Sequence, residues 1–298
     1  MTNPYFTVIV PTYNRAKLIP ATLSTVQRQT YPDFEVIVID NGSTDETDTI
    51  MEDFLKDSRF QYIRSEENNE RAWSRNRGLA VAKGTYVTFL DSDDFMYESC
   101  LEDAFNYSKT KPEFHFFHNF YELVDENQNS IYKFRFPSLQ NQYKALASGN
   151  FISCIGAFIH RSIYLNLRFN LDPKMIGAED YEIWFDVLAK HKIGRIEKIN
   201  SGIRDHGGRS VNNGVYSNLD HQERQLINKI RSSDLLTARF GRYLPRLRAN
   251  FSLHKAIAEN KNGNKKNALR QLAHAAEQDP TAFLTRRAMG VIYNILKF

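Results

Sequence analysis

Residues 74–94 read SRNRGLAVAKGTYVTFLDSDD, and this stretch contains most of the helix-strand unit that decides the fold. The sequence predicts a helix over 71–82, which begins just before the stretch, and then a strand over 85–90, TYVTFL. A strand of this composition is buried on both faces, as in a parallel sheet covered by helices. The strand ends in the polar turn Asp91-Ser92-Asp93-Asp94, at the edge where such sheets bind ligands.

The same alternation of strand and helix occurs upstream. Apolar, β-branched runs at 6–10 (FTVIV), 34–39 (FEVIVI) and 60–63 predict three more strands. Between the first two, apolar side chains recur with the spacing of one helix face at Ile19, Thr22, Leu23 and Val26. Repeated β/α units of this kind predict an α/β fold with a doubly wound, mainly parallel sheet.

The rest of the chain departs from this alternation. Residues 114–203 contain aromatic, strand-like runs among helices (FHFFHNF, IYKFRF and IGAFIH), which predict an antiparallel part of the sheet. From Leu219 the pattern is helical, with breaks at Gly263 and Pro280. We therefore expect an α/β domain over 1–215 and a helical, basic C-terminal extension over 216–298.

Composition narrows the class of protein. With 42% hydrophobic and 25% charged residues, the chain is typical of a globular protein, and its formal charge of +4 is too small to indicate nucleic-acid binding. Cys100 and Cys154 form no CxxC pair, so no zinc site is evident, and a reducing cytoplasm fits best. The sequence contains neither a signal-peptide pattern nor an apolar run of roughly 18 residues, and we expect no membrane span.

The acidic turn at 91–94 suggests metal chemistry. Several carboxylates on one turn provide the hard oxygen ligands that Mg²⁺ or Mn²⁺ prefers beside a diphosphate. The alternative is a solvated turn in which Asp94 or Ser92 caps the next helix.

Residues 6–210 resemble the family 2 glycosyltransferases, which are inverting enzymes with the GT-A fold. Four matches occur in order: VIVPTYNR at 8–15, VIVIDNGSTDET at 36–47, SRNRGLAVAKGTYVTFLDSDD at 74–94 and GAEDYEIWFDVLAKH at 177–191. Four ordered motifs are far more specific than a DxD motif alone.

The resemblance implies a nucleotide-sugar site. It places the following residues at the nucleotide and its phosphates: Pro11, Tyr13, Arg15, Asp40, Arg75, Asp91 and Ser92. An aromatic face stacks on a base, a carboxylate accepts the imide N–H of uracil, and a guanidinium matches phosphate geometry. The alternatives are that Tyr13 packs on the sheet, that Asp40 caps the helix after Ser43, and that Arg75 lies on an exposed helix face.

The resemblance also implies the catalytic groups. Asp180 matches the family's base, at the start of a helix whose apolar stripe is expected to be core and whose dipole favours the ionised carboxylate. Asp93, with Asp91 and His206, matches the metal position, and Arg209 and Ser210 could reach phosphate oxygens. Simple N-capping is the alternative for Asp180. The segment from His206 to Ser210 departs from the family pattern, because many family members have a longer spacing before the serine.

These matches predict an inverting, metal-dependent (Mn²⁺ or Mg²⁺) transfer of a sugar from a nucleotide-sugar donor, most simply a UDP-sugar, to an acceptor hydroxyl. The family further implies bacterial surface polysaccharide or lipid-linked glycan synthesis, but the sequence names neither sugar nor acceptor. A Rossmann oxidoreductase is disfavoured because Pro11-Thr12-Tyr13-Asn14 replaces GxGxxG. A nucleotidyltransferase, or a catalytically silent nucleotide-sugar-binding scaffold, is the remaining alternative.

The C-terminal region has two candidate contact surfaces. Arginines interleave with Phe240, Tyr243, Leu244 and Leu247, and Met289, Ile292, Tyr293 and Leu296 form a terminal stripe. One interpretation is peripheral contact of a cytoplasmic enzyme with the inner face of a membrane. The other is that the stripes pack within the protein or form a homo-oligomer contact.

Overall fold

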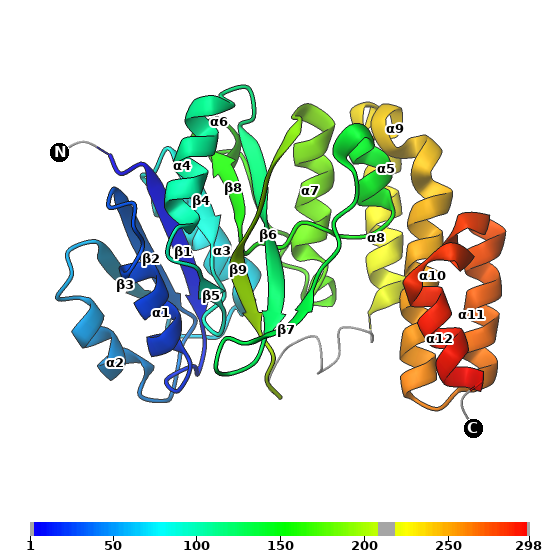
Figure 1. Cartoon of the computed structure of the whole chain (residues 1–298), viewed down its shortest axis with the longest axis horizontal. Helices are drawn as coiled ribbons and strands as arrows, with labels where there is room; N and C mark the ends of the chain where they lie inside the picture. Colours follow the sequence, from blue (N-terminus) through cyan, green and yellow to red (C-terminus); the bar gives the residue numbers. More distant parts are fainter. Residues whose placement is uncertain (1–2, 208–217, 297–298) are drawn as a thin grey trace. The chain divides into compact units, whose positions relative to one another are not determined.

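The computed structural model describes residues 3–207 and 218–296 (Figure 1). The chain divides into two compact units. The first comprises residues 1–136, 152–173 and 190–209, and the second comprises 137–151, 174–189 and 210–298. The second unit therefore includes two segments that precede residue 215, and the domain boundary at that residue stays a prediction.

The first unit contains the expected parallel sheet. Its strands β1 (Phe6–Thr12), β2 (Phe34–Asp40), β3 (Phe60–Arg64) and β4 (Tyr86–Phe89) lie in the order β3-β2-β1-β4 and pair in parallel. The helices α1 (Ile19–Gln27), α2 (Thr47–Phe54) and α3 (Glu70–Val81) alternate with them. All residues of β1, β2 and β4 are buried, which confirms strands covered on both faces.

The two faces of the sheet are covered by different helices. Val8 and Val36 belong to a core that also contains Leu23 of α1. Ile9, next to Val8, faces the other way and meets Gly78 of α3. A Cβ at that glycine would lie 2.4 Å from the Ile9 side chain, so only glycine allows α3 to approach β1 this closely.

The predicted antiparallel part is also present. β8 (Ala157–His160) pairs antiparallel with β4 and with β6 (Phe116–Val124), which in turn pairs with β7 (Ser130–Lys133) and β9 (Ile193–Arg204). β5 (Phe95–Met96) pairs with β9, and α4 (Cys100–Thr110) and α6 (Arg161–Tyr164) complete the unit. The run IYKFRF forms only the short, exposed β7, whose strand ends at Lys133.

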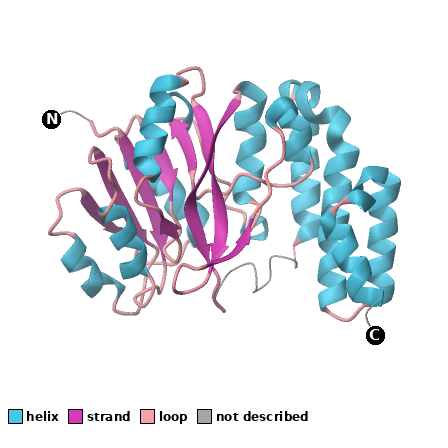
Figure 2. Cartoon of the chain, in the orientation of Figure 1, coloured by secondary structure: helices cyan, strands magenta, loops and turns pink. Residues whose placement is uncertain are grey.

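The second unit is helical in the residues that the structure describes (Figure 2). Its α-helices are α5 (Gln142–Ala147), α7 (Glu179–Lys190, of which the last residue belongs to the first unit), α8 (Leu219–Arg231), α9 (Asp234–Phe240), α10 (Leu244–Lys261), α11 (Lys265–Gln278) and α12 (Arg286–Leu296). Short 3₁₀ helices are η1 (Leu139–Asn141), η2 (Pro173–Met175, of which the first residue belongs to the first unit), η3 (Gly241–Tyr243) and η4 (Pro280–Leu284). The breaks predicted at Gly263 and Pro280 separate α10, α11 and α12.

The two C-terminal stripes differ. Phe240 and Leu247 are each 1% exposed, and the Phe240 ring lies 4.7 Å from that of Phe185, so these two residues of the first stripe are core. Tyr243 and Leu244 are half-buried, and contact of this segment with a membrane stays a prediction. In the second stripe, Met289 and Tyr293 are exposed. In the described part of the chain, we find no helix long and apolar enough to span a membrane.

Candidate active site

Three polar turns leave the same edge of the parallel sheet. β1 and β2 stay in register up to Thr12 opposite Asp40, and the amide of Asn41 donates to the carbonyl of Thr12 at 2.9 Å. On the other side of β1, the amide of Leu90 donates to the carbonyl of Ile9 at 3.0 Å. The turns after β1, β2 and β4 therefore meet where the sequence predicted the ligand site.

The turns after β1 and β2 are linked by side-chain hydrogen bonds. Asn14 adopts a left-handed conformation with a φ of 50°, and its amide donates to the Ser43 hydroxyl at 2.9 Å. Its side-chain oxygen accepts from the amide of Thr44 at 2.8 Å. Asp45 accepts from the amide of Ala16 at 3.0 Å. These bonds were not predicted from the sequence, although Asn, Ser and Asp are the residues that make such turns.

This linked pair of turns presents Tyr13 to solvent. Tyr13 is 40% exposed, whereas the neighbouring Pro11 is buried in β1. An exposed aromatic ring on a rigid turn is suited to stacking on a planar ligand. The alternative in which Tyr13 packs on the sheet does not fit this exposure.

Asp40 lies at the end of β2 with no exposed surface. One carboxylate oxygen accepts from the amide of Ser43 at 2.8 Å, and the other accepts from the Tyr62 hydroxyl. Burial and the Asp40 carboxylate together raise the pKa of Tyr62. Asp40 therefore holds the turn after β2. It does not cap the next helix, because α2 begins only at Thr47. Its contact with a base stays a prediction.

Arg75 is 3% exposed, so it does not lie on a solvated helix face. Its guanidinium donates to Asp91 at 2.8 Å and lies 5.5 Å from the ring of Phe169. Asn76 holds the backbone of Phe169, since its side chain donates to the Phe169 carbonyl at 2.9 Å and accepts from the Phe169 amide at 2.7 Å. The role of Phe169 could not be found from the motifs.

The Asp91 carboxylate is held in its ionised form. Burial alone would raise its pKa, but the charges of Arg75, Arg71 and Arg15 and the hydrogen bond from Arg75 lower the pKa below its usual value. Ser92, next in the turn, is buried. The Asp91 carboxylate of this turn thus lies beside arginines from other elements, and these arginines can bind phosphate.

Asp93 and His206 lie side by side. The distance between Asp93 Oδ2 and His206 Nε2 is 3.0 Å, and Arg15 Nε lies 3.5 Å from the same carboxylate oxygen. Both the Asp93 and the His206 side chain retain a little exposure, at 18% and 11%. Asp93, His206 and Arg15, which were predicted to contact the metal or the diphosphate, thus form one cluster. Arg209 and Ser210 lie outside the described residues.

Asp94 connects the acidic turn to the strand that leads to His206. Its carboxylate is 6% exposed and accepts from the backbone amide of Arg204 at 2.9 Å. Immediately afterwards, Phe95 of β5 pairs with Gly202 of β9. From the sequence, Asp94 was predicted only as a possible helix cap, because nothing in the motifs indicated the distant amide from which it accepts.

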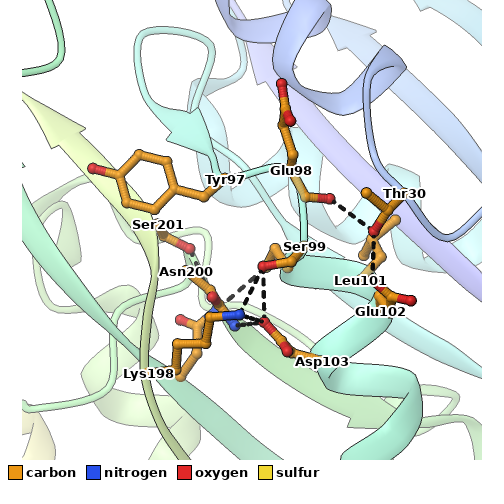
Figure 3. A network of polar contacts seen from close by, with 12 residues as sticks. Thr30, Tyr97, Glu98, Ser99, Leu101, Glu102, Asp103, Lys198, Asn200 and Ser201 are labelled. Atoms are coloured by element: carbon orange, nitrogen blue, oxygen red, sulfur yellow. Dashed lines mark hydrogen bonds and ion pairs between the residues drawn. The ribbon is translucent and has the colours of Figure 1, made fainter.

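A second set of contacts holds the same two segments together (Figure 3). Lys198 of β9 donates to the Asp103 carboxylate in α4 at 2.7 Å, and the side chain of Asn200 donates to the same carboxylate at 3.0 Å. The turn that bears Asp93 leads into β5 and α4, and His206 follows β9. These contacts therefore help to position the pair.

Asp180 belongs to the second compact unit, at the start of α7. Its carboxylate accepts from the amide of Tyr181 at 2.7 Å, and Glu179 accepts from the amide of Gly177 at 2.5 Å. The predicted stripe is core: Tyr181, Trp184, Phe185 and Leu188 are at most 5% exposed. Asp180 therefore lies at the end of a firmly anchored helix, and its role as a base stays a prediction.

Comparison with known proteins identifies the family. The family model for glycosyl transferase family 2 matches residues 7–167, more than half of the chain. The chain belongs to this family. This is the family that the four sequence motifs resemble.

Two curated relatives illustrate its similarity. The glycosyltransferase is 32% identical over 208 residues to an uncharacterised glycosyltransferase of Rickettsia conorii, covering 67% of this chain but only 33% of that protein. The chain thus spans about a third of the length of that relative. It is 30% identical over 220 residues to the Escherichia coli protein named UDP-Glc:alpha-D-GlcNAc-diphosphoundecaprenol beta-1,3-glucosyltransferase WfaP, covering 74% of this chain and 84% of WfaP.

Two solved structures share the fold. Staphylococcus aureus TarS 1–349, in complex with UDP-GlcNAc, matches with a TM-score of 0.66 and 20% identity, covering 95% of this chain and 92% of that one. The mannosyltransferase PcManGT of Pyrobaculum calidifontis, in complex with GDP-Man and Mn²⁺, matches with a TM-score of 0.61 and 18% identity, covering 100% and 87%. The predicted GT-A-type mixed sheet with C-terminal helices is confirmed.

The described side chains of the site are compatible with binding of a divalent metal ion. The oxygen of Asp93 and the nitrogen of His206 are close enough together to bind one ion as neighbouring ligands. Among the described residues, no group of three His, Cys, Asp or Glu side chains forms a cage, and Asp91 is paired with Arg75. Two protein ligands suit Mg²⁺ or Mn²⁺, because substrate phosphates and water commonly complete the coordination shell of these ions.

Proposed function

We propose that this glycosyltransferase transfers a sugar from a UDP-sugar to an acceptor hydroxyl with inversion at the anomeric carbon. The observation that carries the proposal is the meeting of Arg15, Asp93 and His206 at the carboxyl edge of the sheet. A carboxylate beside an imidazole and a guanidinium is suited to a ligand that combines a diphosphate with a metal.

The donor nucleotide is proposed to lie against the linked turns after β1 and β2. The exposed ring of Tyr13 stacks on the base, and the hydrogen bonds of Asn14 keep this ring-bearing turn rigid. WfaP is named for a UDP-Glc donor, and TarS was solved with UDP-GlcNAc, which supports uridine as the nucleoside.

The leaving diphosphate requires compensation of charge. Arg15 lies close to Asp93, and Arg75 is held on Asp91 from a buried position, so both guanidinium groups are oriented before the donor binds. Asp93 and His206 would hold Mn²⁺ or Mg²⁺, which supplies Lewis-acid stabilisation of the departing diphosphate. The PcManGT complex, which contains Mn²⁺, supports this metal.

Asp180 is proposed as the base. Its ionised carboxylate takes the proton of the acceptor hydroxyl as the hydroxyl oxygen forms a bond to the anomeric carbon. The bond between that carbon and the diphosphate oxygen breaks on the opposite side, and the nucleoside diphosphate leaves with the electron pair. A single displacement of this kind inverts the configuration.

The acceptor is proposed to be a lipid-linked glycan in the assembly of a bacterial surface polysaccharide. WfaP, of which the chain covers 84%, is named for an acceptor on diphosphoundecaprenol. On this proposal, the acceptor of the enzyme is anchored in a bilayer.

A donor screen tests the proposal. The full chain is incubated with UDP-, GDP-, TDP- and CMP-activated sugars, with Mn²⁺, Mg²⁺ or EDTA, and released nucleotide is measured. We expect UDP from at least one UDP-sugar, with loss of release in EDTA. Release of pyrophosphate instead would indicate nucleotidyl transfer, and turnover undiminished by EDTA would contradict the metal assignment.

A further inference from the structure

η4 and α12 expose a group of large apolar side chains. Leu284 is 84% exposed, Met289 62% and Tyr293 63%, and Phe283 is also exposed. Met289 and Tyr293 are one turn apart and share a face of α12. Val291, by contrast, packs into the alanine-rich core of α10, α11 and α12. Several large apolar side chains exposed in one short segment are more than the scattered exposure usual on a protein surface.

A basic hollow lies in the same compact unit. Its volume is about 490 Å³, and it is lined by Asn141, Lys144, Arg242, Tyr243, Pro245, Arg246 and Asp279. Arg246 pairs with Asp279 at 2.8 Å, so these two charges compensate each other. Lys144 and Arg242 are the other charged residues of the lining, and they give it a net charge of +2. The hollow is therefore suited to anionic groups.

The hollow lies beside the start of η4, the helix that carries Phe283 and Leu284. Arg246 donates to the Thr281 hydroxyl in η4 at 3.1 Å, and Asp279 immediately precedes that helix. η4 ends at Leu284, only about 10 Å further along at the rise of a 3₁₀ helix. No carboxylate side chain follows Asp279 in the sequence, whereas Arg286, Arg287 and Lys297 do.

We propose that this basic-apolar surface, formed by Lys144, Arg242, Phe283, Leu284, Met289 and Tyr293, binds the surface of an anionic lipid bilayer. Basic side chains would meet phosphate head groups, and the apolar side chains would enter the interface.

Charge argues against a second copy of the chain as the partner. In a symmetric dimer the same patch would face itself, which brings Lys144 and Arg242 of two copies together, while the carboxylate of the lining, Asp279, is already paired with Arg246. An anionic bilayer, in contrast, complements both parts of the surface.

Vesicle co-sedimentation tests the proposal with the full chain and needs neither donor nor metal. Its outcome is therefore independent of the proposed reaction. Vesicles of phosphatidylcholine alone are compared with vesicles that contain phosphatidylglycerol, at low and high salt. We expect pelleting only with the anionic vesicles, weakened by salt. Absence of binding to anionic vesicles at low salt would overturn the proposal.

Paired variants locate the contact. Met289→Glu/Tyr293→Glu should lower partitioning by about tenfold or more, because it removes apolar area and adds repulsion. Lys144→Gln/Arg242→Gln should lower it by about fivefold for each charge removed. The matched controls Leu55→Glu and Lys56→Gln alter exposed residues at the end of α2 in the other unit. They should bind like the parent chain, and equal losses in the controls would contradict the assigned surface.

Two further measurements complete the test. In Tyr293→Trp, the emission of the new indole should shift to the blue with anionic vesicles, while Leu55→Trp should not change. Light scattering without lipid should give the same mass for the parent and for Met289→Glu/Tyr293→Glu. A dimer that only the parent forms would assign this face to self-association and overturn the lipid proposal.

Discussion

Asp93 and His206 are 113 positions apart in the sequence, yet their side chains lie 3.0 Å apart. The pairing of β5 with β9 creates this proximity, because Asp93 precedes β5 and His206 follows β9. A two-residue strand thus joins the acidic motif to the histidine segment.

Asp93→Ala should lower turnover by about a hundred- to thousandfold and abolish metal-dependent UDP binding, since the diphosphate loses its charge compensation. Calorimetry of UDP binding with and without Mn²⁺ measures the second effect. Asp53→Asn, an exposed carboxylate variant on α2, serves as the control. If folded Asp93→Ala binds UDP with unchanged metal dependence, Asp93 is not a ligand.

Asp94 is expected to act as a positioning residue. Asp94→Ala leaves the Arg204 amide without its acceptor, which should lower the free energy of unfolding by about 1–3 kcal/mol and weaken Mn²⁺-dependent UDP binding. Asp94→Asn keeps an oxygen acceptor and should retain most of both. Denaturant unfolding and calorimetry compare the two variants. A direct ligand role would instead make Asn as damaging as Ala.

Asp40→Ala separates a base contact from a structural role. We expect UDP affinity to fall by about tenfold, with metal dependence retained, and stability to fall by about 1–3 kcal/mol because Ser43 and Tyr62 lose their acceptor. Tyr62→Phe removes one of these hydrogen bonds but keeps the carboxylate, and it should preserve UDP affinity. Should Asp40→Ala also preserve the affinity, Asp40 serves only the turn.

The sequence was most informative about buried, regular elements. The β-branched runs of β1 and β2 and the stripe of α7 could be predicted because burial repeats with a fixed period. The grouping of residues 137–151 and 174–189 with the C-terminal helices could not, since it depends on tertiary packing such as that of Tyr143 and Phe185 against Phe240.

Site residues were predictable where a motif carries them, and their partners were not. The motifs gave Arg75 and Asp91 as separate positions, whereas their 2.8 Å ion pair depends on how α3 packs on β1, the neighbour of β4. Phe169 and Arg204 lie outside the four motifs, and only the folded chain brings them to Arg75 and Asp94. Local patterns report propensity and burial, but not which distant groups meet.

Asp180→Asn should lower turnover by about 10²–10⁴-fold and leave donor affinity nearly unchanged, because the base acts on the acceptor proton in the transition state. Steady-state kinetics with a transferable acceptor and calorimetry with UDP measure the two effects. Asp186→Asn, on the same helix, is the matched control. Near-normal turnover of Asp180→Asn would move the base elsewhere, and Glu179→Gln would then be tested first.

The stereochemical outcome follows from the number of displacements. With Asp180 taking the acceptor proton and no carboxylate attacking the sugar, the reaction has one displacement, so an α-linked UDP-sugar should give a β-linked product. Proton NMR of the purified product reads the anomeric coupling constant directly. The donor, incubated under identical conditions without enzyme, controls for its own anomeric configuration. An α-linked product would require two displacements or attack from the same face, and it would exclude Asp180 as the base of a single in-line displacement.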